Sequence, residues 1–160
     1  MAPSTVEAAA KKGRVRIRAR VAKKILAVHP TLDNLPDWAR IDATGTRRRL
    51  QALMVAGWSA QVLASRLEMD RNTIRKILLA DVVRVSTARA VRNLFRVMWN
   101  RQPPSELRYE RASVTRTRAY AARQGWAPAA AWDDIDNPKC RPKGVPRRET
   151  PLDTPAQTAA

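Results

Sequence analysis

The strongest constraint on the fold of this chain is a pair of short amphipathic segments separated by a brief break. In the first segment, Ser59 can cap a helix, apolar residues recur at helical spacing, and Ala64 is small enough for a second helix to cross closely. The break covers residues 68–70, and Asp70 can cap a second segment whose branched apolar residues share one face. This pattern predicts a helix-turn-helix.

Glu68 is the one departure from the usual pattern of such a motif. Most helix-turn-helix turns place glycine at this position in the left-handed conformation, and another residue there costs about 1–2 kcal/mol. We therefore expect either a turn widened by one residue or a tolerated strain at Glu68. An ordinary helical hairpin with a solvated charged face is the alternative interpretation of the pattern.

The outer face of the second helix carries residue types that hydrogen-bond base edges and phosphates. The N-terminal part of a recognition helix reaches the floor of the major groove. The residues assigned to base reading are Arg71, Asn72, Thr73 and Arg75. The residues assigned to phosphate binding are Ser59, Gln61, Lys76, Arg84, Arg47, Arg48 and Arg49.

Three of these arginines lie in the first turn of a helix that the apolar spacing predicts over residues 46–56, with Gly57 as the residue that ends it. Cations at a helix N-terminus oppose the helix dipole. The placement indicates that Arg47, Arg48 and Arg49 serve something other than helix stability. A bound phosphate would reverse the sign of the interaction.

The charge of the chain points to a polyanionic partner. Lysine and arginine number 31 against 14 aspartate and glutamate, a formal net charge of +17, and nucleic acid is the polyanion expected to balance it. An anionic membrane surface is the rival, but the longest apolar run, residues 52–58, is far too short to span a bilayer. At the N-terminus small residues precede basic ones, the reverse of a signal peptide, so we expect a cytoplasmic, nucleoid-associated protein of a bacterial cell.

The rest of the pattern predicts an all-α domain of five or six helices over residues 14–138, between disordered tails at 1–13 and 139–160. Further helices are expected from about residue 18 to 28, from a cap at Ser86 to about residue 100, and from about 106 to 124. Their expected buried stripes, besides a core Trp58, are Val91, Leu94, Phe95, Met98 and Trp99 in one helix and Tyr109, Ala112, Ala119 and Tyr120 in the next.

No catalytic residue, metal site or cofactor is expected. His29 adjoins a proline, and Cys140 lies in a basic tail that would not hold it beside His29 as a nucleophile. Asp133, Asp134 and Asp136 are oxygen ligands of the kind that Mg²⁺ accepts. Their setting favours ion pairs with basic residues of the same domain, which would dock the C-terminal segment.

Three further stretches carry a resemblance to known proteins: ATGTRRRLQALMVAGWS before the motif, RVSTARAVRNLFRVMW after it, and GWAPAAAWDDIDNP near the end. Over roughly residues 16–138, the chain resembles small helix-turn-helix DNA-binding proteins of actinobacteria and their phages. This resemblance implies DNA binding, with regulation of transcription as the usual role.

The sequence therefore predicts a protein that binds double-stranded DNA sequence-specifically and acts as a phage-type repressor or activator of transcription. Two alternatives stay open: an accessory factor that bends DNA during recombination, and a basic interaction protein that grips a host enzyme such as RNA polymerase. A homodimer is also left open. A DNA footprint separates these alternatives, since an interaction protein would protect no DNA.

Overall fold

The computed structural model describes residues 19–27 and 31–144, which belong to two compact units, residues 1–35 and 36–160. In the first unit, α2 (Ala19–Leu26) confirms that a helix lies in the basic segment near the N-terminus. The sequence placed this helix and the motif in one domain, whereas the structure divides them. The predicted tail at 1–13, the ends of the predicted first helix, His29, and residues 145–160 lie outside the described residues.

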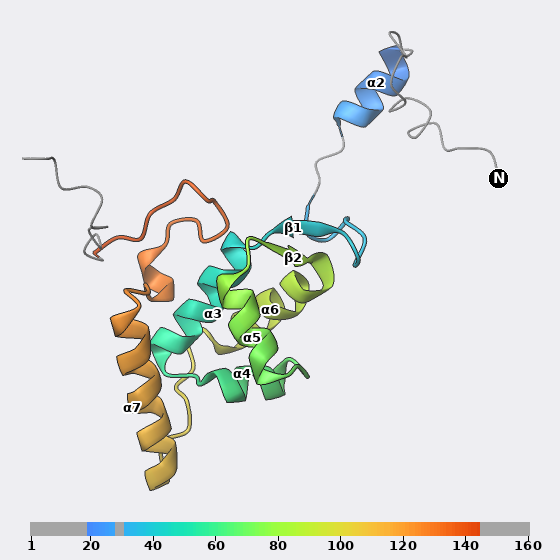
Figure 1. Cartoon of the computed structure of the whole chain (residues 1–160). Coiled ribbons are helices and arrows are strands. Elements are labelled where there is room, and N and C mark those ends of the chain that lie inside the picture. The colour runs from blue at the N-terminus through green and yellow to red at the C-terminus, as the bar shows by residue number, and fades with distance from the viewer. Residues whose placement is uncertain (1–18, 28–30, 145–160) are drawn as a thin grey trace, which may run out of the picture. The chain divides into compact units, whose positions relative to one another are not determined.

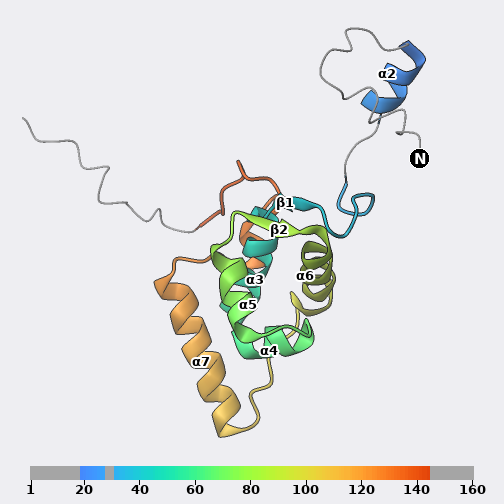
Figure 2. The same cartoon turned by 45° about the vertical axis from the view of Figure 1, so that its right-hand side comes forward.

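The second unit is built around α3 (Thr44–Ala56), as Figures 1 and 2 show. Three helices pack on it: α5 (Arg71–Leu79), α6 (Val85–Met98) and α7 (Arg108–Arg123), while α4 (Ala60–Arg66) packs against α5. The largest fully buried side chains come from α3, α4, α5 and α6: Leu50, Leu53, Leu63, Ile74, Val85, Val91 and Met98. The described residues are therefore mainly helical, as predicted.

Gly57 ends α3 as the sequence predicted. Its φ of 107° is left-handed, and its backbone N–H donates to Met54 O at 3.0 Å while that of Trp58 donates to Leu53 O at 3.0 Å. A residue with a Cβ would be strained in this conformation. Trp58 is buried just after the turn, so the end of α3 is fixed by both backbone and side chain.

A short antiparallel pair of strands was not predicted. β1 (Arg40–Asp42) pairs with β2 (Val82–Arg84), with Ile41 opposite Val83. Three residues are too few for an alternating pattern to stand out in a sequence. Because β2 runs directly into α6, Arg84 occupies the N-cap position, and the predicted cap at Ser86 is wrong. The backbone N–H of Ser86 donates instead to Asp37 O at 3.1 Å.

The predicted buried stripes are only partly correct. Val91 and Met98 of α6 are buried, but Trp99, the C-cap residue of this helix, is 52% exposed. In α7, Tyr109 and Tyr120 are exposed, and the buried residues are Thr117 and Ala121. Small side chains let α7 approach α3 closely, so its large aromatic residues lie outside the contact.

An η1 turn of 3₁₀-helix (Ala129–Ala131) follows α7, and the chain then returns to the N-terminal end of α3. Among the described residues, no helix combines the length and the apolar character needed to cross a membrane.

Candidate nucleic-acid interface

The two helices predicted from the pair of amphipathic segments are α4 and α5. The Ser59 hydroxyl accepts a hydrogen bond from Val62 N at 3.3 Å, and a carboxylate oxygen of Asp70 accepts one from Asn72 N at 2.6 Å. Both predicted caps are therefore confirmed. The inner faces are buried at Leu63 and Ala64 in α4 and at Ile74 and Ile77 in α5. The sequence also placed Val62 and Leu78 on the apolar faces, but Val62 is exposed and Leu78 is half-buried.

The turn between α4 and α5 keeps its tight form with a glutamate in it. Glu68 has a φ of 53°, the one positive value outside glycine among the described residues. The backbone N–H of Met69 still donates to Ala64 O at 2.9 Å, which closes the end of α4. Of the two expectations for Glu68, the tolerated strain is therefore the one that the structure shows.

Replacing Glu68 with glycine is expected to stabilise the protein. Glycine removes a left-handed cost of about 1–2 kcal/mol and adds an entropic cost of about 0.5–1 kcal/mol, a net gain of about 0–1.5 kcal/mol. Thermal melting should show a rise of roughly 2–4 °C. Glu68→Ala is the matched control, because alanine keeps the strain; an equal rise in both variants would mean that the glutamate side chain, and not the backbone, is unfavourable.

The outer face of α5 presents most of the residues assigned to bases. Arg71, Asn72 and Arg75 are exposed, as is Lys76, whereas Thr73 is half-buried. In the part of the chain that the structure describes, the side chains of Arg71, Arg75 and Lys76 make no hydrogen bond or ion pair. Their charges are therefore available to an outside partner.

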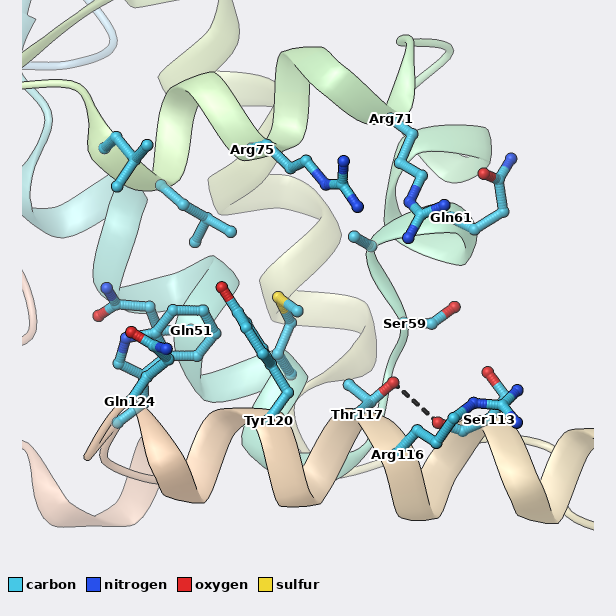
Figure 3. Close-up of a pocket in the computed structure, with 15 residues that line it drawn as sticks. Gln51, Ser59, Gln61, Arg71, Arg75, Ser113, Arg116, Thr117, Tyr120 and Gln124 are labelled. Carbon is cyan, nitrogen blue, oxygen red and sulfur yellow. Dashed lines mark hydrogen bonds between the residues drawn. The ribbon is translucent and has the colours of Figure 1, made fainter.

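Arg71 and Arg75 also line a groove of about 700 Å³ beside α5 (Figure 3). Its opposite wall is α7, which contributes Arg116 and Tyr120, and its floor includes Gln51 of α3. The complete lining is Gln51, Met54, Ser59, Ala60, Gln61, Arg71, Arg75, Leu78, Leu79, Ser113, Arg116, Thr117, Tyr120, Gln124 and Trp126. It holds three arginines and no carboxylate, so it is suited to an anion.

The arginines in the first turn of α3 have partners inside the domain. Arg47 donates to Ala80 O at 3.1 Å and lies 3.7 Å from a carboxylate oxygen of Asp81. Arg49 forms a bidentate ion pair with Asp136, in which each terminal nitrogen of the guanidinium donates to one carboxylate oxygen. Arg47 and Arg49 are therefore used inside the domain, although the sequence assigned them to phosphates.

Arg48 is the most heavily used of the three. Its guanidinium donates to the carbonyl oxygens of residues 135, 137, 138 and 140 at 2.6–3.3 Å, and it lies 4.1 Å from the ring centre of Trp132. Burial lowers the pKa of Arg48 from its ordinary value. Arg48 lies at the start of α3, where its charge opposes the helix dipole. The backbone carbonyls of the C-terminal segment bind its guanidinium there, in place of the phosphate that was expected.

The segment that Arg48 and Arg49 hold is the one carrying the three aspartates. Asp136 pairs with Arg49 of α3, which confirms the expected docking for this carboxylate. Asp133 instead pairs at 2.6 Å with Lys143 of the same C-terminal segment, and Asp134 accepts a hydrogen bond from the backbone N–H of Asp136 at 3.0 Å. The Lys143 backbone N–H also donates to Ala131 O at 2.8 Å. Contacts with the domain thus continue beyond Pro138, where the sequence placed the start of a disordered tail.

Acid should release this segment. The hydrogen bond from Arg49 lowers the pKa of Asp136, so the pair contributes to stability above the ordinary aspartate value of about 3.9, and the contribution is lost as the pH falls through the lower folded pKa. We expect the NMR signal of the Trp132 indole to shift as the pH falls below about 4. Asp136→Asn should remove that step; an unchanged step in the variant would assign it to another carboxylate.

The structure brings together some of the predicted site residues and separates others. Ser59, Gln61, Arg71 and Arg75 share the groove, whereas Arg84 lies in β2 and does not line it. The α7 side of the groove was not predicted from the sequence. A usable signal was present, because residues 113, 116, 117, 120 and 124 fall on one helix face and are polar or basic.

No family model, curated protein or solved structure matches this chain. Among the described residues, no group of three or more histidine, cysteine, aspartate or glutamate side chains is placed to hold a metal ion.

Proposed function

We propose that this chain binds double-stranded DNA through a helix-turn-helix formed by α4 and α5. In this proposal α5 enters the major groove, and α4 crosses the sugar-phosphate backbone. One observation supports it most: the arginines of the second unit divide into two sets. Arg47, Arg48 and Arg49 are used inside the domain, whereas Arg71 and Arg75 have no partner among the described residues and flank a groove without carboxylates.

The residues of α5 divide between base reading and backbone contact. Arg71 and Asn72 lie in the first turn and Arg75 one turn later, so all three are placed toward the end of the helix that enters a groove deepest. Arginine can donate two hydrogen bonds to guanine, and asparagine can make two with adenine. Thr73 is half-buried, which makes it the weakest of the four assigned to bases. Lys76 is suited to a phosphate.

The role that follows from this activity is regulation of transcription. A domain of this size that occupies one major-groove site would compete with, or recruit, other proteins at a promoter. The sign of regulation depends on where the site lies relative to the promoter.

Selection of bound duplexes from a random DNA pool by the full chain tests the proposal. Enrichment of a short motif, followed by a footprint over that motif, would support it. Retention of DNA without any enriched motif would contradict sequence-specific reading. Failure to retain DNA at all would contradict DNA binding, and would leave a protein partner as the target of the basic face.

A further inference from the structure

The second wall of the groove belongs to α7, for which no DNA-contacting role was predicted from the sequence. The groove-lining residues of α7 recur at helical spacing on one face: Ser113, Arg116, Thr117, Tyr120 and Gln124. This face overlaps the contact with α3 at Thr117, which is buried together with Ala121. Arg116, Tyr120 and Gln124 are exposed, so packing of the core does not explain their presence on the groove side.

The side chains of this wall are those that hold phosphates in protein–DNA complexes. Arg116 is exposed and makes no hydrogen bond or ion pair within residues 19–27 and 31–144. The side chain of Tyr120 extends from α7 toward α5, and its hydroxyl group points into the groove (Figure 3). Its ring is held edge-on against Trp126, with centres 5.4 Å apart. Arginine, tyrosine and glutamine all donate to phosphate oxygens.

The geometry of a DNA duplex gives this wall a specific ligand. A helix in the major groove has a sugar-phosphate backbone on each side, so with α5 in the groove one backbone would run along the side of α5 that faces α7. The space there is the groove of about 700 Å³, with Arg71 and Arg75 on one wall and Arg116 on the other.

We infer that the groove between α5 and α7 seats the sugar-phosphate backbone of one strand of the bound DNA. Arg116, Tyr120 and Gln124 hold its phosphates from the α7 side. This inference rests on the proposed function and adds a second element that binds DNA without reading its sequence. The α7 contacts would increase affinity and orient α5 on the duplex. Phosphate contacts set the position of a protein along DNA but do not distinguish one base from another.

Arg116→Ala in the full chain is the direct test, measured by fluorescence anisotropy on a random-sequence duplex of about 20 bp, two helical turns. Across about 50 to 200 mM salt, the slope of log K against log salt should become shallower by about 0.9, the value for one lost phosphate contact. Affinity should fall roughly tenfold at the low-salt end. Tyr120→Phe should weaken binding by less, since it removes one uncharged donor.

Arg111→Ala is the matched control on the same helix. Its guanidinium donates to the carbonyl oxygens of Ser105 and Glu106, and it does not line the groove, so the variant loses the same charge from α7 without losing the proposed contact. Arg96→Ala, in α6, is a second charge control, because Arg96 is exposed and also lies outside the groove. Thermal melting of each variant checks that the fold is retained.

The outcomes separate this inference from the proposed function. A larger loss of DNA affinity for Arg116→Ala than for both controls would support binding of the sugar-phosphate backbone in the groove. Equal small losses in all three variants would overturn it, while loss of binding in an Arg71→Ala/Arg75→Ala variant would still support α5 as the DNA helix. If neither set of variants changes DNA binding, the proposed function fails as well. Binding of an acidic protein that depends on Arg116 would then assign the groove to that partner.

Discussion

Removing both groove-lining arginines of α5 is expected to abolish sequence-specific DNA binding. In the Arg71→Ala/Arg75→Ala variant, each lost arginine removes about 1–3 kcal/mol of discrimination, which together amounts to about 2–6 kcal/mol. The enriched duplex from the selection should then bind no better than random DNA. Anisotropy titrations of the two duplexes at one salt concentration measure this directly.

A control for this variant must lose two positive charges at positions outside the groove. Arg96→Ala/Arg101→Ala removes two exposed arginines that do not line the groove, one from α6 and one just after it. This control should weaken binding to both duplexes by a similar small factor and keep the preference for the enriched one. If the control loses that preference as completely as the α5 variant does, overall charge, and not α5, determines binding.

Replacing Gly57 with alanine is expected to destabilise the fold by about 2–4 kcal/mol. The left-handed conformation accounts for about 1 kcal/mol. The remainder is steric, because a Cβ at this position would lie 2.8 Å from Val114 Cγ1 and 3.2 Å from Pro103 Cγ. The melting temperature should fall by roughly 10 °C. Since Val114 belongs to α7, the variant should also weaken DNA binding by displacing one wall of the groove.

Gly125→Ala separates the two contributions. Gly125 has a φ of 66°, but nothing lies within 4 Å of the Cβ that alanine would add, so only the backbone cost applies. The difference in unfolding free energy between the two variants then measures the steric part. Gly57→Ala/Val114→Ala should recover some of that part. Equal destabilisation in Gly57→Ala and Gly125→Ala would show that α7 does not press against the end of α3.

Local signals in the sequence were enough to predict the α4–α5 pair. The caps at Ser59 and Asp70 and the turn at Gly57 depend on the chemistry of single residues and their near neighbours. Glu68 was the one position where a local rule was broken, and the structure keeps the tight turn there at the expense of a strained backbone.

What could not be predicted depends on partners far away in the sequence. The phosphate role assigned to Arg48 was reasonable from helix electrostatics, yet its carbonyl partners lie 87 to 92 residues further along the chain. The β1–β2 pair joins segments about 40 residues apart that are each three residues long. The face of α7 was misassigned because aromatic residues suggested a core, whereas Thr117 and Ala121 make the buried contact.

The most direct test of the central claim is a comparison of Arg75→Ala with the unaltered chain on the enriched duplex and on each single base-pair variant of it. If α5 reads bases, the unaltered chain should discriminate by about 1–3 kcal/mol at one or two adjacent positions where the Arg75→Ala chain does not discriminate. The other positions should keep their preferences. A profile in which Arg75→Ala weakens binding to every duplex by the same factor would contradict base reading by α5.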